Sequence, residues 1–542
     1  MRPLLIVLLC SIPAFAAGGT CPTGNQTIDP NGNAIAIANV GVNGVVSGSI
    51  TSCFFISKAN GSDSNDGTAE TTGGGHGPWA HLPGMPSCTS TCASTTPTAG
   101  EGFILRGGDT WVNSDLGVAW TWSGNSSHAL YVGIDSTWFN ASCGASWCRP
   151  IFAAGQIALT ANSNLFQEFN QNYVIVDNIE VTGMLNDENG FPMSGGNNDR
   201  VMRTYVHDWA HTGSSDNVGI FATCGAGTMI DHNIVDGSDS SQNTFNGVYS
   251  SCAGTIAFNY FAYLVSGILA DTDIVHDNTI VHTITSADGD HCNALFTMNP
   301  ATALTQLIYN NFINNGNSCP GGVVLWFNGN GSPQSNDGWG FNNVMWGLSS
   351  NPVNIGNHGS GNYGTYHWFN NTVDCTLGGC GGTPPSGPTW TIYDNNNHVI
   401  PSALNFTCSG CTVPVCSIGT GTGCTDLTQT EAVANGQGYT SSNNYAPTNG
   451  SGSTVGAGTN LSSYCTTLSG INAPAGTACA SSGGVGCSYN TSNHTLSCPL
   501  TAENSRPASA AWDIGAFQFA GGGGGGGSDN ATGAVISGAV IQ

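Results

Sequence analysis

The segments Ile230–Val235 (IDHNIV) and Ile256–Phe261 (IAFNYF) contain the phrase that decides the fold: an apolar residue, two variable residues, a polar residue and further apolar residues. Spacings of 19 to 33 residues separate the copies of this phrase, which is too long for a hairpin and typical of one coil of a solenoid. Stacked identical amides can hydrogen-bond along the axis, which would account for the recurrence of Asn. The polar positions are Asn178, Thr204, Asn233, Asn259, Asn278, Asn311, Asn343 and Asn371.

A second repeat runs in step with the first. Each coil therefore carries at least two short strands, and strands of neighbouring coils should pair in parallel at about 4.8 Å. The predicted fold class is all-β, a right-handed parallel β-helix (solenoid) with an N-terminal cap and disulfide-rich C-terminal coils. The copies of the second repeat are Gly219–Phe221, Gly247–Tyr249, Gly267–Leu269, Ala294–Phe296 and Gly322–Val324.

The start of the chain has the pattern of a secretory signal peptide, with Arg2, an apolar run and the small-residue site Ala14-Phe15-Ala16. No other stretch has the eighteen apolar residues of a membrane span, so we expect a secreted or cell-surface protein without membrane insertion. The glycine run 521–527 is typical of a flexible tether. The predicted division is a signal peptide at 1–16, an N-terminal cap with initial strands at 17–165, a regular parallel β-helix at 166–375, irregular disulfide-rich C-terminal coils with a cap at 376–520, and a Gly-rich tether and tail at 521–542.

The chain has 21 cysteines, and removal of a signal peptide would take Cys10 and leave an even number. In an exported chain this favours disulfides over metal clusters or free buried thiols. Cys224 and Cys252 lie five residues after equivalent repeat glycines, so they should sit one coil apart and within bonding distance. The other predicted pairs are Cys292–Cys319, Cys88–Cys92, Cys143–Cys148 and Cys375–Cys380.

Charged residues make up 7% of the chain, and the net charge is −25. This charge argues against nucleic acid and anionic membranes as partners. It also argues against simple binding of an acidic polysaccharide, unless a divalent cation bridges the two. The sequence does not indicate the oligomeric state.

Acidic and histidine side chains gather in three loops that the repeat brings to one edge of the solenoid. Crowded carboxylates repel one another, which raises the pKa of some and leaves a proton for acid catalysis. Glycoside hydrolysis needs such a pair. The predicted ridge consists of His207, Asp208, His211, Asp216, Asp236, Asp239, Asp288, Asp290 and His291.

Other interpretations of these residues stay open. Asp208, Asp236 and Asp288 could be turn residues, because tight turns favour Asp. A lyase built on Arg203 and His207 is a second alternative. No cofactor is predicted to be required, but Asp216 and Asp239, together with Asp290, could hold calcium, since hard cations prefer oxygen ligands.

Strand alternation predicts an aromatic strip on the second repeat. If Ile220 and its counterparts face inward, the next residue of each copy faces outward. Flat rings suit the faces of sugars, so this strip is a candidate substrate-binding surface together with His211. A register shifted by one residue would bury the rings instead. The strip contains Phe221, Tyr249, Leu269, Phe296 and Val324, with Trp326 near one end.

Several motifs resemble those of secreted bacterial right-handed parallel β-helix proteins. Residues 55–68 (FISKANGSDSNDGT) and 78–82 (PWAHL) are similar to their opening. Residues 455–461 and 506–517 resemble the closing motifs of the choice-of-anchor Q type, although Gln518 stands where an acidic residue is usual. The resemblance implies fold and export. It does not imply one activity, because the superfamily includes lyases, hydrolases, epimerases and non-catalytic surface proteins.

Two functional hypotheses follow. The first is a secreted protein that interacts with extracellular polysaccharide and cleaves it, as a hydrolase or lyase, through the Asp/His ridge. The second is a non-catalytic adhesin or matrix protein, which the Asn/Gly/Ser/Thr-rich composition and the glycine tether favour. Both make a glycan the expected partner.

Overall fold

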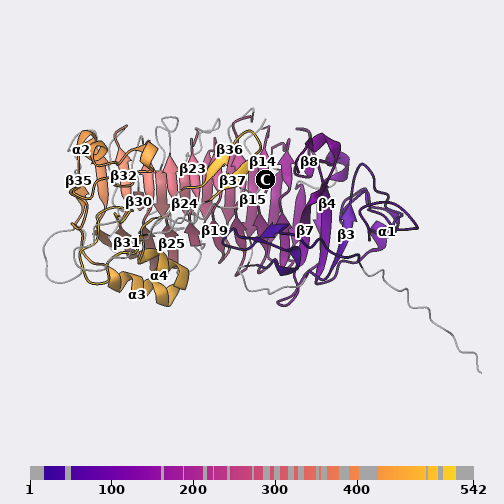
Figure 1. The fold of residues 1–542 in the computed structure, drawn as a ribbon, viewed down its shortest axis with the longest axis horizontal. Coiled ribbons are helices and arrows are strands. Elements are labelled where there is room, and N and C mark those ends of the chain that lie inside the picture. Colours follow the sequence, from indigo (N-terminus) through magenta and orange to yellow (C-terminus); the bar gives the residue numbers. More distant parts are fainter. Residues whose placement is uncertain are drawn as a thin grey trace, which may run out of the picture.

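The computed structural model describes residues 18–42, 50–159, 164–186, 188–210, 217–223, 225–240, 245–270, 274–284, 293–297, 305–314, 323–327, 335–348, 353–355, 363–377, 390–401, 425–483, 486–498 and 504–519. These residues form a solenoid whose first coils lie at the indigo end of Figure 1 and whose last coils lie at the orange end. All strand pairs between coils are parallel within the described part. The predicted parallel β-helix is therefore confirmed.

Three sheets run along the solenoid. In axial order, sheet 1 contains β3 (Ser52–Ile56), β4 (Glu101–Gly107), β7 (Leu130–Phe139), β10 (Val174–Asp177), β13 (Arg200–Met202), β16 (Met229–Asp231), β19 (Thr255–Ala257), β22 (Ile274–His276), β25 (Thr305–Tyr309), β28 (Ser335–Phe341), β31 (Tyr363–Phe369) and β33 (Trp390–Asn395). Sheet 2 contains β5 (Thr110–Val112), β8 (Ile151–Ala153), β11 (Glu180–Thr182), β14 (Tyr205–His207), β17 (Ile234–Asp236), β20 (Tyr260–Ala262), β23 (Thr279–Val281), β26 (Phe312–Asn314), β29 (Val344–Trp346), β32 (Thr372–Cys375), β34 (His398–Pro401) and β35 (Leu427–Thr428). Sheet 3 contains β6 (Val118–Trp120), β9 (Phe166–Phe169), β12 (Asn189–Ser194), β15 (Asn217–Thr223), β18 (Phe245–Ser250), β21 (Ser266–Ala270), β24 (Asn293–Thr297), β27 (Val323–Phe327) and β30 (Val353–Ile355).

The remaining elements lie outside these sheets. Two short antiparallel hairpins are formed by β1 (Thr27–Ile28) with β2 (Ala34–Ile35) and by β36 (Ser488–Asn490) with β37 (Thr495–Ser497). The helices are α1 (Ser90–Ser94), α2 (Glu431–Gly436), α3 (Ser462–Ile471) and α4 (Ala473–Cys479), with 3₁₀ turns η1 (Ile37–Asn39), η2 (Asn113–Asp115), η3 (Ala141–Cys143) and η4 (Ser441–Asn443). No helix in the described ranges is both long and apolar enough to cross a membrane.

A two-residue corner joins sheet 1 to sheet 2 in each coil. Its first residue adopts a left-handed backbone, as at His232 and Phe258, and from Asn233 onward its second residue carries a buried amide. In the coil of Asn259, the backbone N–H and Nδ2 both donate to Asn278 Oδ1, at 3.1 and 2.9 Å. Equivalent bonds link successive residues of the ladder Asn233, Asn259, Asn278, Asn311, Asn343, Asn371 and Asn397. The predicted amide stack is confirmed and extends one coil further than the repeat indicated.

The assignment of Asn178 to this ladder is wrong. Asp177 pairs with Met202, so Asn178 aligns with Arg203 at the left-handed position, and Ile179 aligns with Thr204. Asn178 and Arg203 both have φ values above 50°. Asn tolerates this backbone conformation better than most residues, which explains why an Asn stands there without joining the stack.

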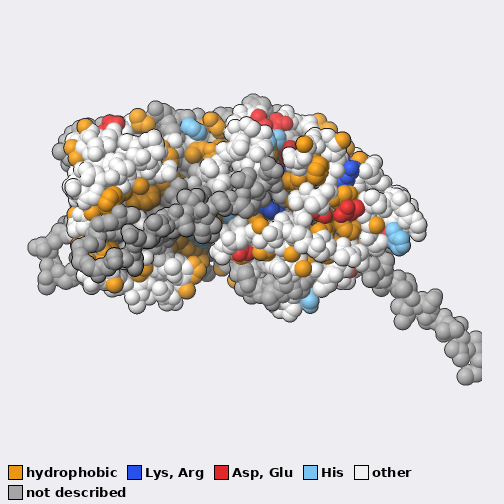
Figure 2. All heavy atoms as spheres, in the orientation of Figure 1, with side chains coloured by type: hydrophobic (Ala, Val, Ile, Leu, Met, Phe, Trp, Pro, Cys, Tyr) orange, Lys and Arg blue, Asp and Glu red, His pale blue; other side chains and the backbone are white. Residues whose placement is uncertain are grey.

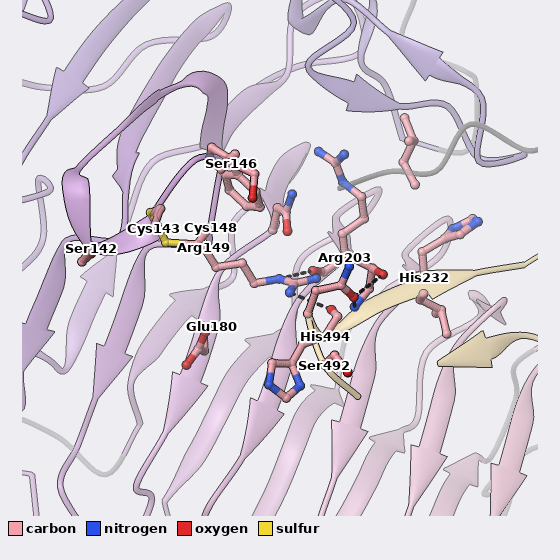
Figure 3. Close-up of a pocket in the computed structure, with 16 residues that line it drawn as sticks. Ser142, Cys143, Ser146, Cys148, Arg149, Glu180, Arg203, His232, Ser492 and His494 are labelled. Atoms are coloured by element: carbon pink, nitrogen blue, oxygen red, sulfur yellow. Dashed lines mark hydrogen bonds between the residues drawn. A yellow bond between two sulfur atoms is a disulfide. The ribbon is translucent and has the colours of Figure 1, made fainter. Parts of the chain in front are cut away.

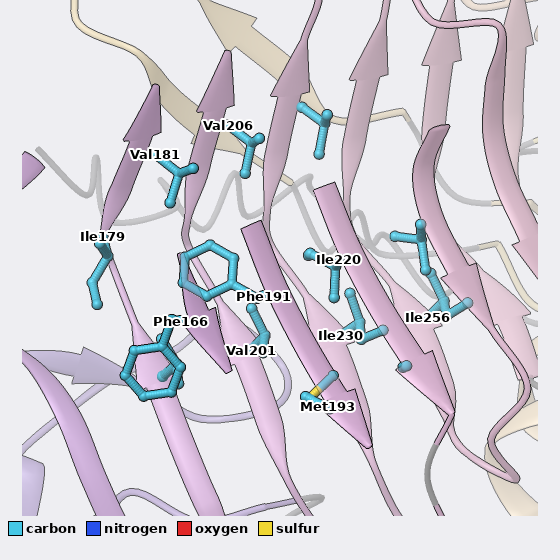
Figure 4. Close-up of a cluster of buried hydrophobic side chains, with 14 of the residues drawn as sticks. Phe166, Ile179, Val181, Phe191, Met193, Val201, Val206, Ile220, Ile230 and Ile256 are labelled. Atoms are coloured by element: carbon cyan, nitrogen blue, oxygen red, sulfur yellow. The ribbon is translucent and has the colours of Figure 1, made fainter. Parts of the chain in front are cut away.

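The second repeat is correct for four of its five copies. Ile220, Val248, Ile268 and Leu295 pair in sequence along sheet 3 and are fully buried. The register predicted for the fifth copy, Gly322–Val324, is wrong. Val323 pairs with Asn293, so Leu325 is the residue that aligns with Leu295. Figure 4 shows part of the apolar column, to which all three sheets contribute side chains such as Val201, Val206 and Ile220.

The outer face of sheet 1 is covered near both ends. Toward the N-terminal end, Ile28, Ile37 and Val40 pack against sheet residues. Toward the C-terminal end, α3 and α4 cover an aromatic row that includes Tyr309 and Phe341. The two closing motifs contact each other through a bridge between Gly458 and Trp512 and through the carboxylate of Asp513, which accepts from the Gly456 and Phe519 amides.

Disulfides join Cys88 to Cys92 and Cys143 to Cys148, as predicted. Cys252 and Cys375 are also disulfide-bonded, but their predicted partners Cys224 and Cys380, like the pair Cys292–Cys319, lie outside the described residues. Three further bridges were not predicted: Cys21–Cys53, Cys465–Cys479 and Cys487–Cys498. The signal-peptide segment 1–16 and the tail 521–542 lie outside the described residues as well.

Candidate functional site

Three residues of the predicted ridge come together on neighbouring coils. His207 ends β14, and its Nδ1 lies 2.8 Å from Asp239 Oδ2 in the loop after β17. The Asp208 backbone N–H donates to Asp239 Oδ1 at 3.0 Å, and the Asp208 carboxylate accepts from Gln156 Nε2 at 2.8 Å. Asp236 ends β17 and accepts from the Ser238 amide. The other ridge residues, His211, Asp216, Asp288, Asp290 and His291, lie outside the described residues.

His207 is held between two carboxylates. Its Nε2 lies 3.2 Å from Glu180 Oε1, on the preceding coil, while Asp239 binds its other ring nitrogen. Burial alone would lower the pKa of His207, but hydrogen bonds to Asp239 and Glu180 raise it to about 9. The imidazole is therefore protonated at neutral pH and forms an ionic cluster with its neighbours. Burial alone would raise the pKa of Asp239. The hydrogen bond to His207 and the charge of that ring outweigh burial, so the pKa of Asp239 is lowered.

A hairpin from the far end of the sequence covers this cluster. Residues 487–498 contain β36 and β37, are closed by the Cys487–Cys498 disulfide, and lie across sheet 2 near β14 (Figure 1). The Tyr205 ring stacks on His207 at 4.2 Å and on His494 of the hairpin at 4.3 Å. The Tyr489 hydroxyl lies 2.7 Å from His494 Nδ1. Burial is the main cause that lowers the pKa of His494, which favours the neutral imidazole.

A cavity of about 350 Å³ opens beside the cluster. Figure 3 shows Glu180 rising from its strand, Arg149 reaching in from the disulfide-closed loop, and His494 and Ser492 arriving from the hairpin. A second cavity of about 540 Å³ adjoins it and is lined by Asn25, Gln26, Ser136 and Phe139, among others. Both cavities are lined by Ile28, Ser146, Trp147, Asn178 and Arg203.

Arg149 connects three parts of the chain at the cavity wall. Its Nε donates to the Arg203 carbonyl at 3.2 Å, and its Nη1 donates to the His494 carbonyl at 2.8 Å. The guanidinium carbon lies 6.0 Å from the centre of the Tyr205 ring. Burial lowers the pKa of Arg149 to about 10, so the side chain still carries its charge at neutral pH.

Arg203 and Arg200 have buried acidic partners. The Arg203 guanidinium pairs with Asp177 through its Nε and Nη2. Arg200 forms a fully buried pair with Asp231, with Nη2 and Oδ2 separated by 2.6 Å. Arg203 borders both cavities, but its Nη2 is also bound to the carbonyl of Gln26. Arg203 therefore connects the N-terminal segment to the coil corner.

The predicted aromatic strip forms one row of sheet 3. Phe221 and Tyr249 stack at 5.0 Å and are half-buried, while Phe296 is buried. Phe296 pairs with Trp326, so Trp326 rather than Val324 occupies the row. The row lies on a different sheet from the His207 cluster. The two predicted surfaces are therefore separate features of the solenoid.

The residues considered for calcium have other contacts where they are described. The Asp239 carboxylate binds His207 and the Asp208 amide, and Asp216 lies outside the described residues. Among the residues that the structure describes, no three His, Cys, Asp or Glu side chains are grouped closely enough to hold a metal ion.

Few charged side chains lie on the visible surface, as expected from a chain that is only 7% charged. On the face shown in Figure 2, uncharged and apolar side chains dominate, and the basic side chains in view lie on the half formed by the N-terminal coils. The cavity with Arg149 belongs to the same half of the solenoid.

Comparison with known proteins finds similarity in fold only. The GH136 lacto-N-biosidase from Eubacterium ramulus aligns with a TM-score of 0.44 and 11% identity over 64% of this chain and 64% of its own. A rhamnogalacturonan lyase aligns with a TM-score of 0.37 and 14% identity over 65% and 83%, and the alginate lyase from Paenibacillus sp. str. FPU-7 with 0.27 and 13% over 57% and 95%. No protein-family model and no curated protein sequence matches the chain.

Sequence reasoning missed three residues of the site. Glu180 is a charged strand residue in a chain that is only 7% charged, and this rarity was the available signal. Arg149 follows Cys148 in a region without a repeat. His494 contacts Arg149 across 345 positions in the sequence, and no periodicity links them.

Proposed function

We propose that this protein binds an extracellular polysaccharide in the two adjoining cavities. The observation that carries the proposal is their common wall, which joins volumes of about 350 and 540 Å³. Each volume falls in the range of ordinary small-ligand sites, so together they would accommodate several sugar units. Amide, hydroxyl and aromatic side chains, including Gln26, Ser136 and Trp147, supply hydrogen bonds and flat apolar faces.

An extracellular location supports this choice of ligand. The described residues contain five complete disulfides, and disulfides persist in oxidising compartments. The signal-peptide pattern at 1–16 and the resemblance to choice-of-anchor Q closing motifs point in the same direction. We therefore propose export, with the protein released or held at the cell surface.

Cleavage of the bound glycan is a second candidate function, favoured by the His207 cluster. His207 and Glu180 form an ion pair next to the cavity, and Glu180 lines the cavity itself. Hydrolysis requires one acid and one base or nucleophile, and a carboxyl next to an imidazolium supplies a proton donor and an acceptor. Asp208, Arg203, Asp288, Asp290 and His291 stay sequence-based catalytic candidates, and Asp216 with Asp239 stays the proposed calcium pair.

The test uses the full chain and a panel of plant and microbial polysaccharides. Binding is measured by retention on insoluble glycan, and cleavage by new reducing ends and by the ultraviolet absorbance of unsaturated products. We expect the wild-type protein to be retained on at least one insoluble glycan. If the wild type also cleaves a glycan, Glu180→Gln should form at least about 100-fold less product than the wild type. Glu431→Gln, at an exposed carboxylate on α2, is the matched control.

The outcomes separate the candidates. Retention with reducing ends alone indicates a hydrolase, and an added ultraviolet chromophore indicates a lyase. Retention without products indicates the adhesin or matrix protein. Absence of retention on every glycan would contradict the proposed function. Unchanged cleavage in Glu180→Gln, Asp290→Asn and His291→Ala would remove these residues from the catalytic candidates.

A further inference from the structure

We propose that Arg149 is the receptor for an anionic group of the bound glycan, and that this group is the carboxylate of a uronic acid. The inference deepens the proposed function, on which it rests, because it names the substrate class. It also reverses an expectation from the net charge of −25, which argues against acidic polysaccharides when the chain is considered as a whole.

The contacts of Arg149 differ from those of the arginines around it. Arg106, Arg200 and Arg203 each lie within 4.0 Å of an aspartate. Arg149 donates to two backbone carbonyls, those of Arg203 and His494, and no carboxylate of the described residues lies within ion-pair distance of it. Backbone carbonyls orient a guanidinium but do not neutralise it. The cavity wall therefore holds a guanidinium without a direct salt bridge; burial lowers its pKa, and the Glu180 carboxylate opposes that effect only through space.

The neighbouring charges leave room for an anion. Glu180 lines the same cavity, but its carboxylate is bound to His207, which is protonated at neutral pH. Arg203 is neutralised by Asp177, and His232 binds Asp231 through its Nδ1. His207 is shared between Glu180 and Asp239, so Arg149 is the cation at the cavity wall that can offer its charge directly to a bound anion.

The geometry suits a carboxylate in particular. The two carbonyl bonds fix the plane of the guanidinium, and a fixed guanidinium matches the two oxygens of a carboxylate. Burial disfavours the isolated charge, which is why the pKa of Arg149 is lowered to about 10, and an anion in the cavity would offset that cost. Hydroxyl and amide groups of Ser146 and Asn178 line the space around it, as recognition of a sugar ring requires.

The decisive experiment compares matched oligosaccharides by calorimetric titration of the full-length protein. The set contains trisaccharides of galacturonate, glucuronate and mannuronate, the carboxyl-reduced form of each, and a sulfated galactose trisaccharide. Short ligands limit the repulsion from a net-negative protein. We expect wild-type protein to bind at least one uronate about 10- to 100-fold more tightly than its reduced form, as one charge-assisted contact allows.

Two substitutions test the residue. Arg149→Gln should abolish the preference for the acidic form, and Arg149→Lys should keep part of it, since the charge remains but the planar fork is lost. Lys58→Gln removes one positive charge at the Asp115 pair in the N-terminal loop and should leave the preference unchanged. If Arg149→Gln does not fold, which a thermal melt detects, the wild-type comparison between acidic and reduced ligands decides.

The failures are distinguishable. Equal binding of acidic and reduced trisaccharides, or an unchanged preference in a folded Arg149→Gln, overturns this inference and leaves the proposed function standing. Tighter binding of the sulfated ligand than of every uronate overturns the carboxylate assignment and identifies a sulfate ester. Absence of binding to any member of the set, together with absence of retention on any polysaccharide, overturns both.

Discussion

At the scale of single residues, His207 carries the clearest electrostatic consequence. Glu180 and Asp239 bind its two ring nitrogens. The His207 side chain is mostly buried, with 15% of it accessible, whereas 46% of the Asp239 side chain is accessible. The pKa of His207 is raised to about 9 from an ordinary value near 6.5. A raised pKa in the folded state means that the protonated imidazole stabilises the fold.

This shift predicts a pH-dependent loss of stability. The contribution of His207 is fully present below pH 6.5 and is lost as the pH rises through 9. We expect His207→Gln to lower the free energy of unfolding by about 1–2 kcal/mol at pH 6 and by almost nothing at pH 10; this range allows for solvent screening at Asp239. Urea unfolding at pH 6, 8 and 10 measures it.

A matched histidine gives the control. His76 lies against Asp66, but its side chain is 64% accessible, so His76→Gln should change stability little at any pH. A difference between wild type and His207→Gln that does not depend on pH would contradict the ionic role and leave a packing role.

At the scale of elements, the 487–498 hairpin decides whether the cavity is complete. It supplies His494, Asn493 and Thr495 to the wall. One disulfide closes it, and the bond from Arg149 and a bond from the Cys487 amide to Thr279 Oγ1 attach it to the coils. Its two strands pair only with each other in the described part of the chain. A two-stranded hairpin of this length has little stability without such attachments.

Removal of the Cys487–Cys498 bridge should therefore loosen the hairpin without unfolding the coils. In the Cys487→Ser/Cys498→Ser variant we expect faster proteolysis between positions 488 and 497 and at least about tenfold weaker glycan binding, because the closed loop constrains the hairpin by about 2–3 kcal/mol. The melting temperature of the solenoid should change little.

The control for this prediction is Cys88→Ser/Cys92→Ser, which removes a local bridge at α1, far from the hairpin in Figure 1. It should leave hairpin proteolysis and glycan binding as in the wild type. Equal effects from both double variants would mean that general destabilisation, rather than the hairpin, lowers binding.

At the scale of the whole molecule, long-range clamps hold non-repeating segments on the solenoid. The buried Arg200 donates to the carbonyls of Ile28, Asp29 and Gly41 while it pairs with Asp231. Its contacts thus join segments about 172 positions apart in the sequence. One side wall of the larger cavity, residues 25–28, depends on this attachment.

Breaking this clamp should be costly. Arg200→Gln leaves Asp231 buried without its cation, so we expect the free energy of unfolding to fall by about 3–5 kcal/mol in urea titrations. The double variant Arg200→Met/Asp231→Leu removes both charges and should recover the part of that loss that comes from the buried carboxylate, while the three carbonyls stay without their donor. If the double variant is as unstable as the single one, the pair contributes through its geometry and not through charge compensation.

The sequence by itself determined the solenoid, because its periodic amides and apolar residues are local signals that each coil repeats. Asn233, Asn259 and their successors form the predicted stack, and Ile220, Val248 and Ile268 fill the core. The predicted register was wrong at two copies. Asn178 lies one residue before the ladder position, and Gly322–Val324 lies two residues before the positions equivalent to the other copies. His207, Asp208 and Asp239 were predicted to be close and are, since the repeat relates their coils.

Only the tertiary structure decided which residues make the cavity. Arg149 and His494 meet because a non-repeating loop and a distant hairpin fold back onto sheet 2. A disulfide closes each of these segments on itself, and a single hydrogen bond joins Arg149 to His494. Such contacts leave no period in the sequence. A solenoid repeats its backbone from coil to coil, so periodicity predicts what lies inside it, whereas the segments that return to its surface are placed by side-chain contacts that only the folded chain brings about.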